Sequence, residues 1–570
     1  MSTAGRVNTV DKGVLAGAGP IPCAKMPTIV RRLRAWISGA SVTSWLALTA
    51  ILSGAAALRI WGWDYGIPHP VARPDEEIVL EAVFQMFARG GAEPITFAYP
   101  SLAIYLDVLI LKGYFAWGQL TGHYDRMMDM LLDIVVFRPG LHYRLARIAS
   151  VVFGVGTVAA TYALGRRVHA SKRVGLLASL LVATCLLHVI HSRFATVDGI
   201  TTFFVTVALV LAVKAVQDQK LTSFLAAGLF AGLSTAVKYN AVFVCLAVAV
   251  PALWAARGLE RRERFSLGGK LVASGLVAFA AFAVTSPYSL LRFGEVRVAM
   301  AHLSGILHAP TGELALWTHL RDTFPLGLGW PFYLAAILGF ARAIWSRRPA
   351  ELAMLGFAVP FYLSMAGVRL TYPRYVVPLV PVLAVWAAGL VVTLSSRRSK
   401  LLALPIAAIL VAPGVYGSVR FDRLAAERDS RLLATDWIGE HVRRRSKIAV
   451  CRGYGAPRIN SDRRKPPAFE PVEIPCSADA IRDSGASYVV SHEYPPLGQA
   501  LSAETSKILH ERGRVAASFD PFREGATEEP FFYRADTFYL PISGFSALTR
   551  GGPIVTIWEL DGRSASGGGE

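Results

Sequence analysis

The chain has 570 residues, of which 53% are hydrophobic and 17% are charged, and its mean hydropathy is +0.43. Soluble domains carry about 25% charged residues, so this composition excludes an ordinary soluble enzyme, a disordered protein and a secreted disulfide scaffold. The net charge of +19 is typical of the Lys- and Arg-rich cytoplasmic loops of membrane proteins. We therefore expect an α-helical polytopic membrane protein that contacts membrane lipids and has no nucleic-acid partner.

Apolar segments long enough to cross a bilayer recur along most of the chain, since a spanning helix needs about 20 mostly apolar residues. Twelve apolar segments can be found, but one of them, 100–120, carries Asp107 and Lys112, whose charged side chains are costly at mid-membrane. The tail 1–30 has no cleavable signal pattern, and Arg31, Arg32 and Arg34 directly precede a full-length span, so we expect the first helix to be a signal anchor. The eleven predicted spans are 42–62, 145–164, 174–191, 198–213, 222–237, 240–256, 271–290, 326–345, 351–367, 373–394 and 401–417.

The basic loops set the predicted orientation. Arg31, Arg32 and Arg34 precede the first span, and five basic loops follow later in the chain. Each of these five loops is separated from the next by two spans, so all five lie on one side of the membrane. The positive-inside rule places that side, and the N-terminal arginines, in the cytoplasm. This requires an even number of crossings before the first of these loops, and we therefore assign 100–120 to the outer interface. The N-terminus is then cytoplasmic and the C-terminus extracytoplasmic, in a cell (inner or plasma) membrane. The five loops are 165–173, 214–220, 257–270, 342–351 and 395–400.

Three parts follow from this topology: a cytoplasmic tail (1–41), a transmembrane domain (42–417) and an extracytoplasmic domain (418–570). Inside the second part, 63–141 forms a long outer loop with interfacial helices, and it holds ten acidic residues against five basic ones. A loop of this length between spans is usually functional.

The third part is polar, and its pattern predicts a small α/β domain. Helices are expected at 427–443 and 500–511, and strands at 447–451, 487–491 and 553–560. Cys451 and Cys476 lie together in this domain, and the sequence leaves open whether they form a disulfide.

Two carboxylate sites stand at predicted outer ends of helices. Asp75, Glu76 and Glu77 follow Pro74, where acids favour the first turn of a helix, so a structural role as a helix start is one reading. The other reading is that Asp75, or next to it Glu76, accepts a proton from a hydroxyl nucleophile. Asp198 lies in HSRFATVDG with Arg193, for which helix capping and an interfacial anchor are the structural readings.

Cations also gather at the predicted outer helix ends. Arg147, Lys238 and Arg374 are individually explained as membrane anchors. Together with the two carboxylate sites they predict a cleft in which an acid activates an acceptor and cations stabilise a departing phosphate. His302 and His308 lie in an outer loop, where a lone His is more often structural or exposed than a ligand.

Six motifs follow one another in this chain, and in this order they resemble those of the GT-C glycosyltransferases of the protein O-mannosyltransferase and aminoarabinose transferase superfamily. The resemblance covers roughly 60–395 and implies a GT-C fold with its catalytic Asp in the first outer loop, here Asp75, and a second Asp at Asp198. Aminoarabinose transferases usually carry Lys-Pro where this chain has Tyr99-Pro100, so the role of that Lys is not carried over. The motifs are RPDE (73–76), YPSL (99–102), ARIAS (146–150), HSRFATVD (191–198), AVKYN (236–240) and PRYVVPLVP (373–381).

The sequence therefore predicts an inverting glycosyltransferase that uses a polyprenyl-phosphate-linked sugar donor and a lipid, glycan or protein acceptor. Catalytic roles are expected for Asp75, Glu76 and Asp198. Metal use varies in the family, so a divalent metal remains an open expectation and no other cofactor is expected. A multi-span transporter or lipid flippase is the alternative, although transporters often show internal symmetry and broken helices at mid-membrane. The residues expected to bind the donor phosphate are Lys238, Arg147, Arg374 and Arg193.

Overall fold

The structure is a computed structural model that describes residues 42–69, 73–309, 312–398, 402–460, 467–533 and 539–561. The predicted cytoplasmic tail 1–41, with the basic cluster Arg31–Arg34, lies outside these residues. The chain divides at Ala50 into two compact units. All contacts of the site lie within the second unit, Ile51–Glu570.

Helices make up the chain from Val42 to Ala426, and short 3-10 and π-helical turns interrupt or join several of them. In order they are α2 (Val42–Ile60), α3 (Pro74–Arg89), α4 (Leu102–Leu120), α5 (Met127–Leu132), α6 (Leu141–His169), α7 (Lys172–Thr184), α8 (Leu186–Ile190), α9 (Val197–Asp218), α10 (Leu221–Val237), α11 (Leu246–Ala255), α12 (Arg261–Thr285), α13 (Pro287–Leu291), α14 (Phe293–Leu307), α15 (Ala315–Thr318), α16 (Phe324–Leu328), α17 (Trp330–Ser346), α18 (Pro349–Leu363), α19 (Val380–Arg398) and α20 (Ala403–Ala426).

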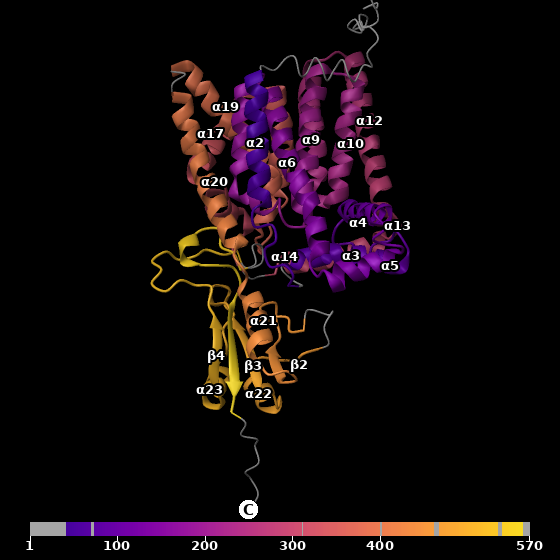
Figure 1. The fold of residues 1–570 in the computed structure, drawn as a ribbon. Coiled ribbons are helices and arrows are strands. Elements are labelled where there is room, and N and C mark those ends of the chain that lie inside the picture. Colours follow the sequence, from indigo (N-terminus) through magenta and orange to yellow (C-terminus); the bar gives the residue numbers. More distant parts are fainter. Residues whose placement is uncertain are drawn as a thin grey trace, which may run out of the picture. The chain divides into compact units, whose positions relative to one another are not determined.

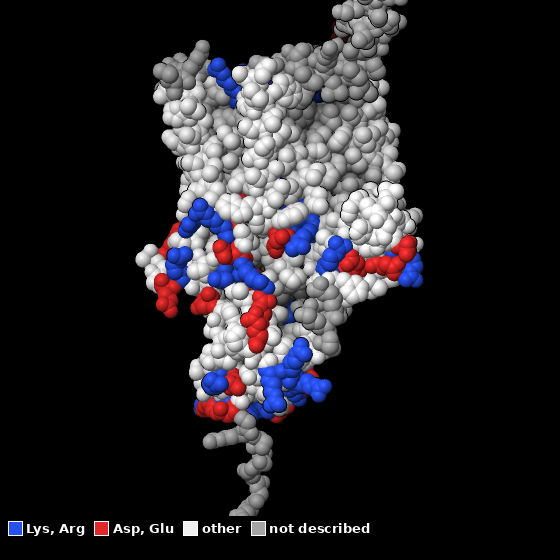
Figure 2. Space-filling model, viewed as in Figure 1, with Lys and Arg blue, Asp and Glu red and all other residues white. Residues whose placement is uncertain are grey.

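Seven of the helical segments in the described residues are long and apolar enough to cross a membrane, and α10 and α18 are shorter apolar helices that fall on predicted spans. The surface of the long helices carries few charges along its middle, whereas charged side chains gather at their C-terminal-domain end (Figure 2). This distribution confirms a helical membrane protein. The count of eleven spans stays a prediction.

The first outer loop folds into helices that lie across the bundle. Figure 1 shows α3, α4 and α5 running across the ends of the long helices α9, α10 and α12, instead of alongside them. The segment predicted to avoid the membrane, 100–120, forms α4. Its Asp107 is buried, and burial raises the pKa of this carboxyl to about 8, with a smaller contribution from Glu76.

Small residues allow α10 and α12 to pack with their backbones close together. A Cβ placed on Gly232 would come within 2.1 Å of the carbonyl oxygen of Ala278, and one on Gly228 within 2.2 Å of that of Ser274. The Ser274 hydroxyl donates to the Phe224 carbonyl across the same contact. The pair of glycines four residues apart therefore fixes the approach of these two helices.

The last helix of the bundle leads directly into the C-terminal domain. Helix α20 continues past position 417 to Ala426, so the predicted boundary at 418 falls inside a helix. The domain proper starts at α21 (Ser430–His441) and also contains α22 (Ala478–Asp483) and α23 (Ala503–Arg512). Its strands are β1 (Lys447–Cys451), β2 (Glu470–Ile474), β3 (Tyr488–Glu493), β4 (Gly513–Phe519) and β5 (Ile554–Leu560).

The five strands form one mixed sheet in the order β2-β1-β3-β5-β4. Strand β1 pairs in parallel with both β2 and β3, and β5 pairs antiparallel with β3 and β4. Ile448 and Val450 of β1, with Val490 and Ile557, form one core beneath α21. The predicted α/β domain is confirmed, including three of its strands, while β2 and β4 were not predicted.

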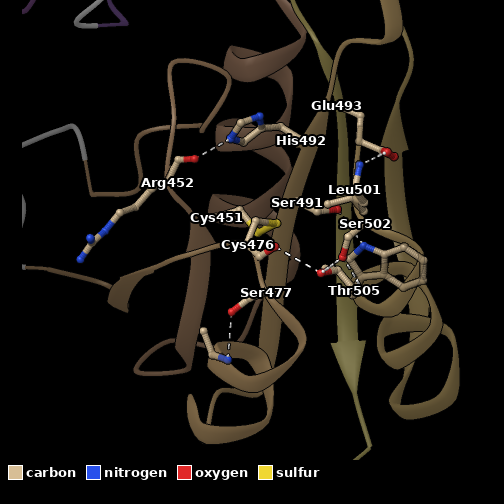
Figure 3. The surroundings of a disulfide bond; sticks show 12 residues. Cys451, Arg452, Cys476, Ser477, Ser491, His492, Glu493, Leu501, Ser502 and Thr505 are labelled. Atoms are coloured by element: carbon tan, nitrogen blue, oxygen red, sulfur yellow. Dashed lines mark hydrogen bonds between the residues drawn. A yellow bond between two sulfur atoms is a disulfide. The ribbon is translucent and has the colours of Figure 1, made fainter. Parts of the chain in front are cut away.

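A disulfide joins Cys451, at the end of β1, to Cys476, just after β2 (Figure 3). Because β1 and β2 are parallel neighbours, the bond ties together the carboxyl ends of two adjacent strands. The sequence left this pairing open, and the structure forms it.

Candidate functional site

Asp75 lies in the first turn of α3, which begins at Pro74. The N-cap position is Arg73, whose side chain makes no capping hydrogen bond, so Asp75 is not the capping residue of this helix. Its carboxylate pairs instead with Arg374, at 2.9 Å between Oδ2 and Nη1. Arg374 lies on the 3-10 helix Pro373–Leu379, almost 300 residues away. The acid is therefore held by a tertiary contact and remains partly exposed.

Asp198, in the first turn of α9, forms the second acid–cation pair. Lys238, the residue that ends α10, places its Nζ 2.7 Å from Oδ1 of Asp198. The Nε atom of Arg374 lies 3.9 Å from the other oxygen of this carboxylate. Asp75, Arg374, Asp198 and Lys238 thus form a continuous row of alternating charge drawn from four elements.

This row opens into a cavity of about 480 Å³. Asp75, Lys238 and Arg374 line it, while Asp198 is buried behind Lys238, with 2% of its side chain exposed. Helix α14 and the segment after α18 form the opposite, mostly apolar wall. A site of this kind is able to hold a polar head group at its charged end and an apolar group along the other wall.

Tyrosines cover both cations of the cavity. The Arg374 guanidinium lies 4.2 Å from the ring centre of Tyr372, and Lys238 Nζ lies 4.4 Å from that of Tyr375. Tyr99 lines the cavity as well, and burial, followed by the negative charge of Asp75, raises the pKa of its phenol above the ordinary value. The aromatic faces favour the charged form of each cation.

Sequence reasoning did not assign roles to these tyrosines or to Asn240 and His308, which also line the cavity. A signal was present for Tyr372, Tyr375 and Asn240, because each stands within two residues of Arg374 or Lys238 in the sequence. His308 gave no such signal, and His302 does not line the cavity.

Glu76 and Arg147, two further predicted site residues, form a sealed pair instead. Their side chains have no exposed surface, and the guanidinium holds the carboxylate through two hydrogen bonds of 2.8 and 2.7 Å. The Ala195 amide donates to Glu76 at 2.7 Å, and Arg147 also donates to the Tyr65 carbonyl. Neither residue lines the cavity, so the placement of Glu76 and Arg147 in the cleft is corrected to a buried contact between α3 and α6.

Arg193 is likewise buried away from the cavity. It donates to Asp422 of α20 and to the Leu58 carbonyl, and its guanidinium lies over the ring of Phe421. It therefore ties the turn before α9 to α2 and α20. The predicted phosphate role of Arg193 is replaced by this structural one, because a donor in the cavity has no access to a side chain with 0% exposure.

The divalent metal left open by the sequence finds no matching donor set. Within the described ranges, no group of three or more His, Cys, Asp and Glu side chains is arranged to hold a metal ion. Asp75 and Asp198 are each paired with a cation of the chain. The positive charge of the site is supplied by Lys238 and Arg374.

Comparison with known proteins gives one family match over part of the chain. The family model for dolichyl-phosphate-mannose-protein mannosyltransferase matches residues 136–288, which include Asp198 and Lys238. No curated protein sequence matches the chain.

The fold is similar to that of two solved membrane transferases. The crystal structure of ArnT from Cupriavidus metallidurans bound to undecaprenyl phosphate matches with a TM-score of 0.51 and 14% identity, covering 93% of this chain and 100% of that one. The archaeal oligosaccharyltransferase AglB from Archaeoglobus fulgidus, in complex with an inhibitory peptide and a dolichol-phosphate, matches with a TM-score of 0.50 and 12% identity, covering 83% and 72%. The shared fold and the family match support a membrane glycosyltransferase with the GT-C fold.

Proposed function

We propose that the chain transfers a sugar from a polyprenyl-phosphate-linked donor to an acceptor hydroxyl at the extracytoplasmic face of the membrane. The observation that carries this proposal is the row Asp75–Arg374–Asp198–Lys238 at one end of a cavity whose other wall is apolar. A carboxylate beside two cations suits a reaction in which a hydroxyl loses a proton while a phosphate departs.

Asp75 is the proposed general base. It accepts the proton of the acceptor hydroxyl as that oxygen attacks the anomeric carbon, and the bond from this carbon to the phosphate oxygen breaks with inversion. General-base help of this kind is typically worth about 10²–10⁴ in rate. Asp75 suits the role better than Glu76, since Asp75 reaches the cavity and Glu76 is sealed against Arg147.

Lys238 and Arg374 are proposed to hold the departing phosphate. Both line the cavity, and each is already held by a carboxylate of the chain. A phosphate that enters adds a negative charge to two balanced pairs, so it competes with Asp75 for Arg374. Donor binding then weakens the Asp75–Arg374 pair and leaves the carboxylate a better base. Asp198 keeps Lys238 in position.

The extracytoplasmic placement follows from the basic loops and from the compartment of the donor. Nucleotide sugars are cytoplasmic, whereas a lipid-linked sugar can lie in the bilayer with its head group in the cavity. The undecaprenyl phosphate and the dolichol-phosphate bound to the two similar structures support a donor of this class. The acceptor classes considered are a lipid, a glycan or a protein.

The test is a transfer assay in membranes with a panel of polyprenyl-phosphate sugars and radiolabelled sugar. We expect sugar transfer from at least one of these lipid-linked donors, and a product with inverted anomeric configuration. We expect no transfer when nucleotide sugars are the only donors present. Transport of the lipid-linked sugar across sealed vesicles without any transfer would support the flippase alternative and contradict the proposal.

A further inference from the structure

A second cavity, of about 410 Å³, lies in the C-terminal domain at the carboxyl end of β1. It is formed by the loop 452–459 over β1 and the edge strand β2, and His69 of the first outer loop closes one side. Strand β1 lies between its two parallel neighbours, β2 and β3. Such a point at the carboxyl ends of parallel strands is where α/β sheets commonly bind ligands.

The lining of this cavity includes two arginines, Arg452 and Arg458, against one acid, Glu473. Figure 2 shows Lys and Arg side chains on the C-terminal domain, with Asp and Glu side chains among them. Arg458 lines the cavity and lies 3.4 Å from Glu473, in an exposed pair. Exposed pairs of this kind are weak and exchange partners readily.

Arg452 is an exposed arginine at the edge of this cavity. It lines the cavity, and in the part of the chain that the structure describes its guanidinium has no ion pair or side-chain hydrogen bond. Figure 3 shows this side chain extending away from the Cys451–Cys476 disulfide. An arginine with free donors favours a carboxylate or a phosphate, which it binds through two parallel hydrogen bonds.

The loop that carries Arg452 is held in place from both sides. Cys451 is cross-linked to Cys476. Gly453 has φ +142° and Gly455 has no room for a side chain, because a Cβ at either position would come within 3 Å of His492. Arg452 is therefore presented by a fixed loop, so that binding an anion costs less conformational entropy than it would on a mobile one.

The same loop is connected to the outer loop that leads into α3. The His69 Nε2–H donates to the Ala456 carbonyl at 2.8 Å, because a carbonyl oxygen only accepts. Burial lowers the pKa of this imidazole to about 3, with Arg431 adding to the effect. His69 Nδ1 is buried and has no hydrogen-bond partner among the described residues. Tyr454, which is 56% exposed, offers an aromatic face at the rim.

We infer that this cavity binds an anionic glycan, that is, sugar units carrying carboxylate or phosphate groups, as part of the acceptor. The inference rests on the proposed glycosyltransferase function. Arg452 and Arg458 pair with the anionic groups, Tyr454 covers the apolar face of a sugar ring, and the contact of His69 with the loop keeps the glycan beside the segment that enters the α3 helix of Asp75.

The test is direct binding to the purified full chain in detergent micelles, measured by isothermal titration. The probes are digalacturonate, which carries two carboxylates, and neutral galactobiose. We expect the wild type to bind digalacturonate at least about tenfold more tightly than galactobiose, and Arg452→Ala to weaken digalacturonate binding about tenfold. Arg514→Ala, at an exposed arginine of β4 outside the cavity, is the matched control and should bind as the wild type does.

Equal binding of digalacturonate by the wild type and Arg452→Ala would overturn the inference. So would Arg452-dependent binding of short-chain phosphatidylglycerol without binding of the saccharide, because the surface would then contact lipid head groups. Binding of the polyprenyl-phosphate donor, measured on the same samples, should be equal in the wild type and Arg452→Ala. If digalacturonate does not bind but sugar transfer from the donor is normal, only the proposed acceptor site is contradicted. If sugar transfer is absent but digalacturonate binds in an Arg452-dependent way, only the proposed reaction is contradicted.

Discussion

The two carboxylates at the start of α3 are adjacent in sequence and yet stand in opposite environments. Asp75 pairs with Arg374 in a cavity and keeps 18% of its side chain exposed, whereas Glu76 pairs with Arg147 with no exposure at all. Both pairs join an acid to an arginine at about hydrogen-bond distance. The difference lies in access, which determines whether the pair is able to exchange its partner for a substrate.

Sealed pairs and accessible pairs also differ in energy. Removing one partner of a buried ion pair leaves an uncompensated charge and costs about 3–5 kcal/mol, because water does not reach it. An accessible carboxylate is solvated by water when its cation is removed. Removing one partner of an accessible pair should therefore lower the transfer rate more than the free energy of unfolding. The predictions below separate these two behaviours.

The largest effect on stability is expected for the sealed pair. Glu76→Gln leaves Arg147 buried without its counter-ion, so we expect the free energy of unfolding to fall by about 3–5 kcal/mol. Thermal unfolding in detergent measures this, and Glu81→Gln, at an exposed position on the same helix, is the control. A normal unfolding midpoint for Glu76→Gln would contradict the structural role of the pair.

The second effect is expected at Lys238. Lys238→Ala should lower transfer per folded molecule by about 10², because one phosphate donor is lost, and Lys238→Arg should restore it only in part, since its planar fork places the donors differently. Lys112→Ala, at an exposed lysine of α4, should leave the rate unchanged. Full activity in Lys238→Ala with a lipid-linked donor would reduce this residue to a membrane anchor.

A smaller effect is expected where α10 meets α12. Gly232→Ala places a methyl group against the Ala278 carbonyl, so we expect a loss of about 1–3 kcal/mol. Gly275→Ala, at a helical position with open space around it, should be neutral or slightly stabilising. Equal unfolding midpoints for the two variants would show that the close approach of these helices is not needed.

The smallest effect concerns Asp107, a buried acid with an unpaired oxygen among the described residues. Its folded pKa of about 8 exceeds that of an unfolded Asp, about 3.9. The folded state then loses stability as the pH rises from about 4 to about 8. Asp107→Asn removes this loss, so its unfolding midpoint should exceed that of the wild type near pH 8 and match it near pH 4. A difference that does not change with pH would contradict a neutral Asp107.

The sequence was informative where a pattern is local. Hydropathy predicted most of the helices, and short apolar runs predicted β1, β3 and β5, because both patterns are read within one segment. Strand β2 is an edge strand in which Glu470, Pro471 and Glu473 are exposed, so it lacks such an apolar run. The motif residues Asp75, Asp198, Lys238 and Arg374 were predicted to share a cleft, and the structure brings them into one row.

Partner choice was not predictable from the sequence. Glu76 and Arg147 are 71 positions apart, and Arg193 and Asp422 are 229 apart, and nothing within either motif indicates which cation is sealed by another element. The position of the adjacent acids Asp75 and Glu76 at the start of a helix does not separate them, and only the family resemblance favoured Asp75. Only the burial of Glu76 against α6, and the cavity beside Asp75, separate them.

The most direct test of this account is a parallel measurement on Asp75→Asn and Glu76→Gln of transfer from a polyprenyl-phosphate sugar and of the thermal unfolding midpoint. We expect Asp75→Asn to unfold at the wild-type temperature and to lose about 10²–10⁴ in transfer rate, because the amide keeps the shape of the side chain but accepts no proton. Glu76→Gln should show the reverse order, with a lowered midpoint and near-normal transfer per folded molecule. Transfer by Asp75→Asn within about tenfold of the wild type, together with a folded and inactive Glu76→Gln, would contradict the account and assign the base to Glu76.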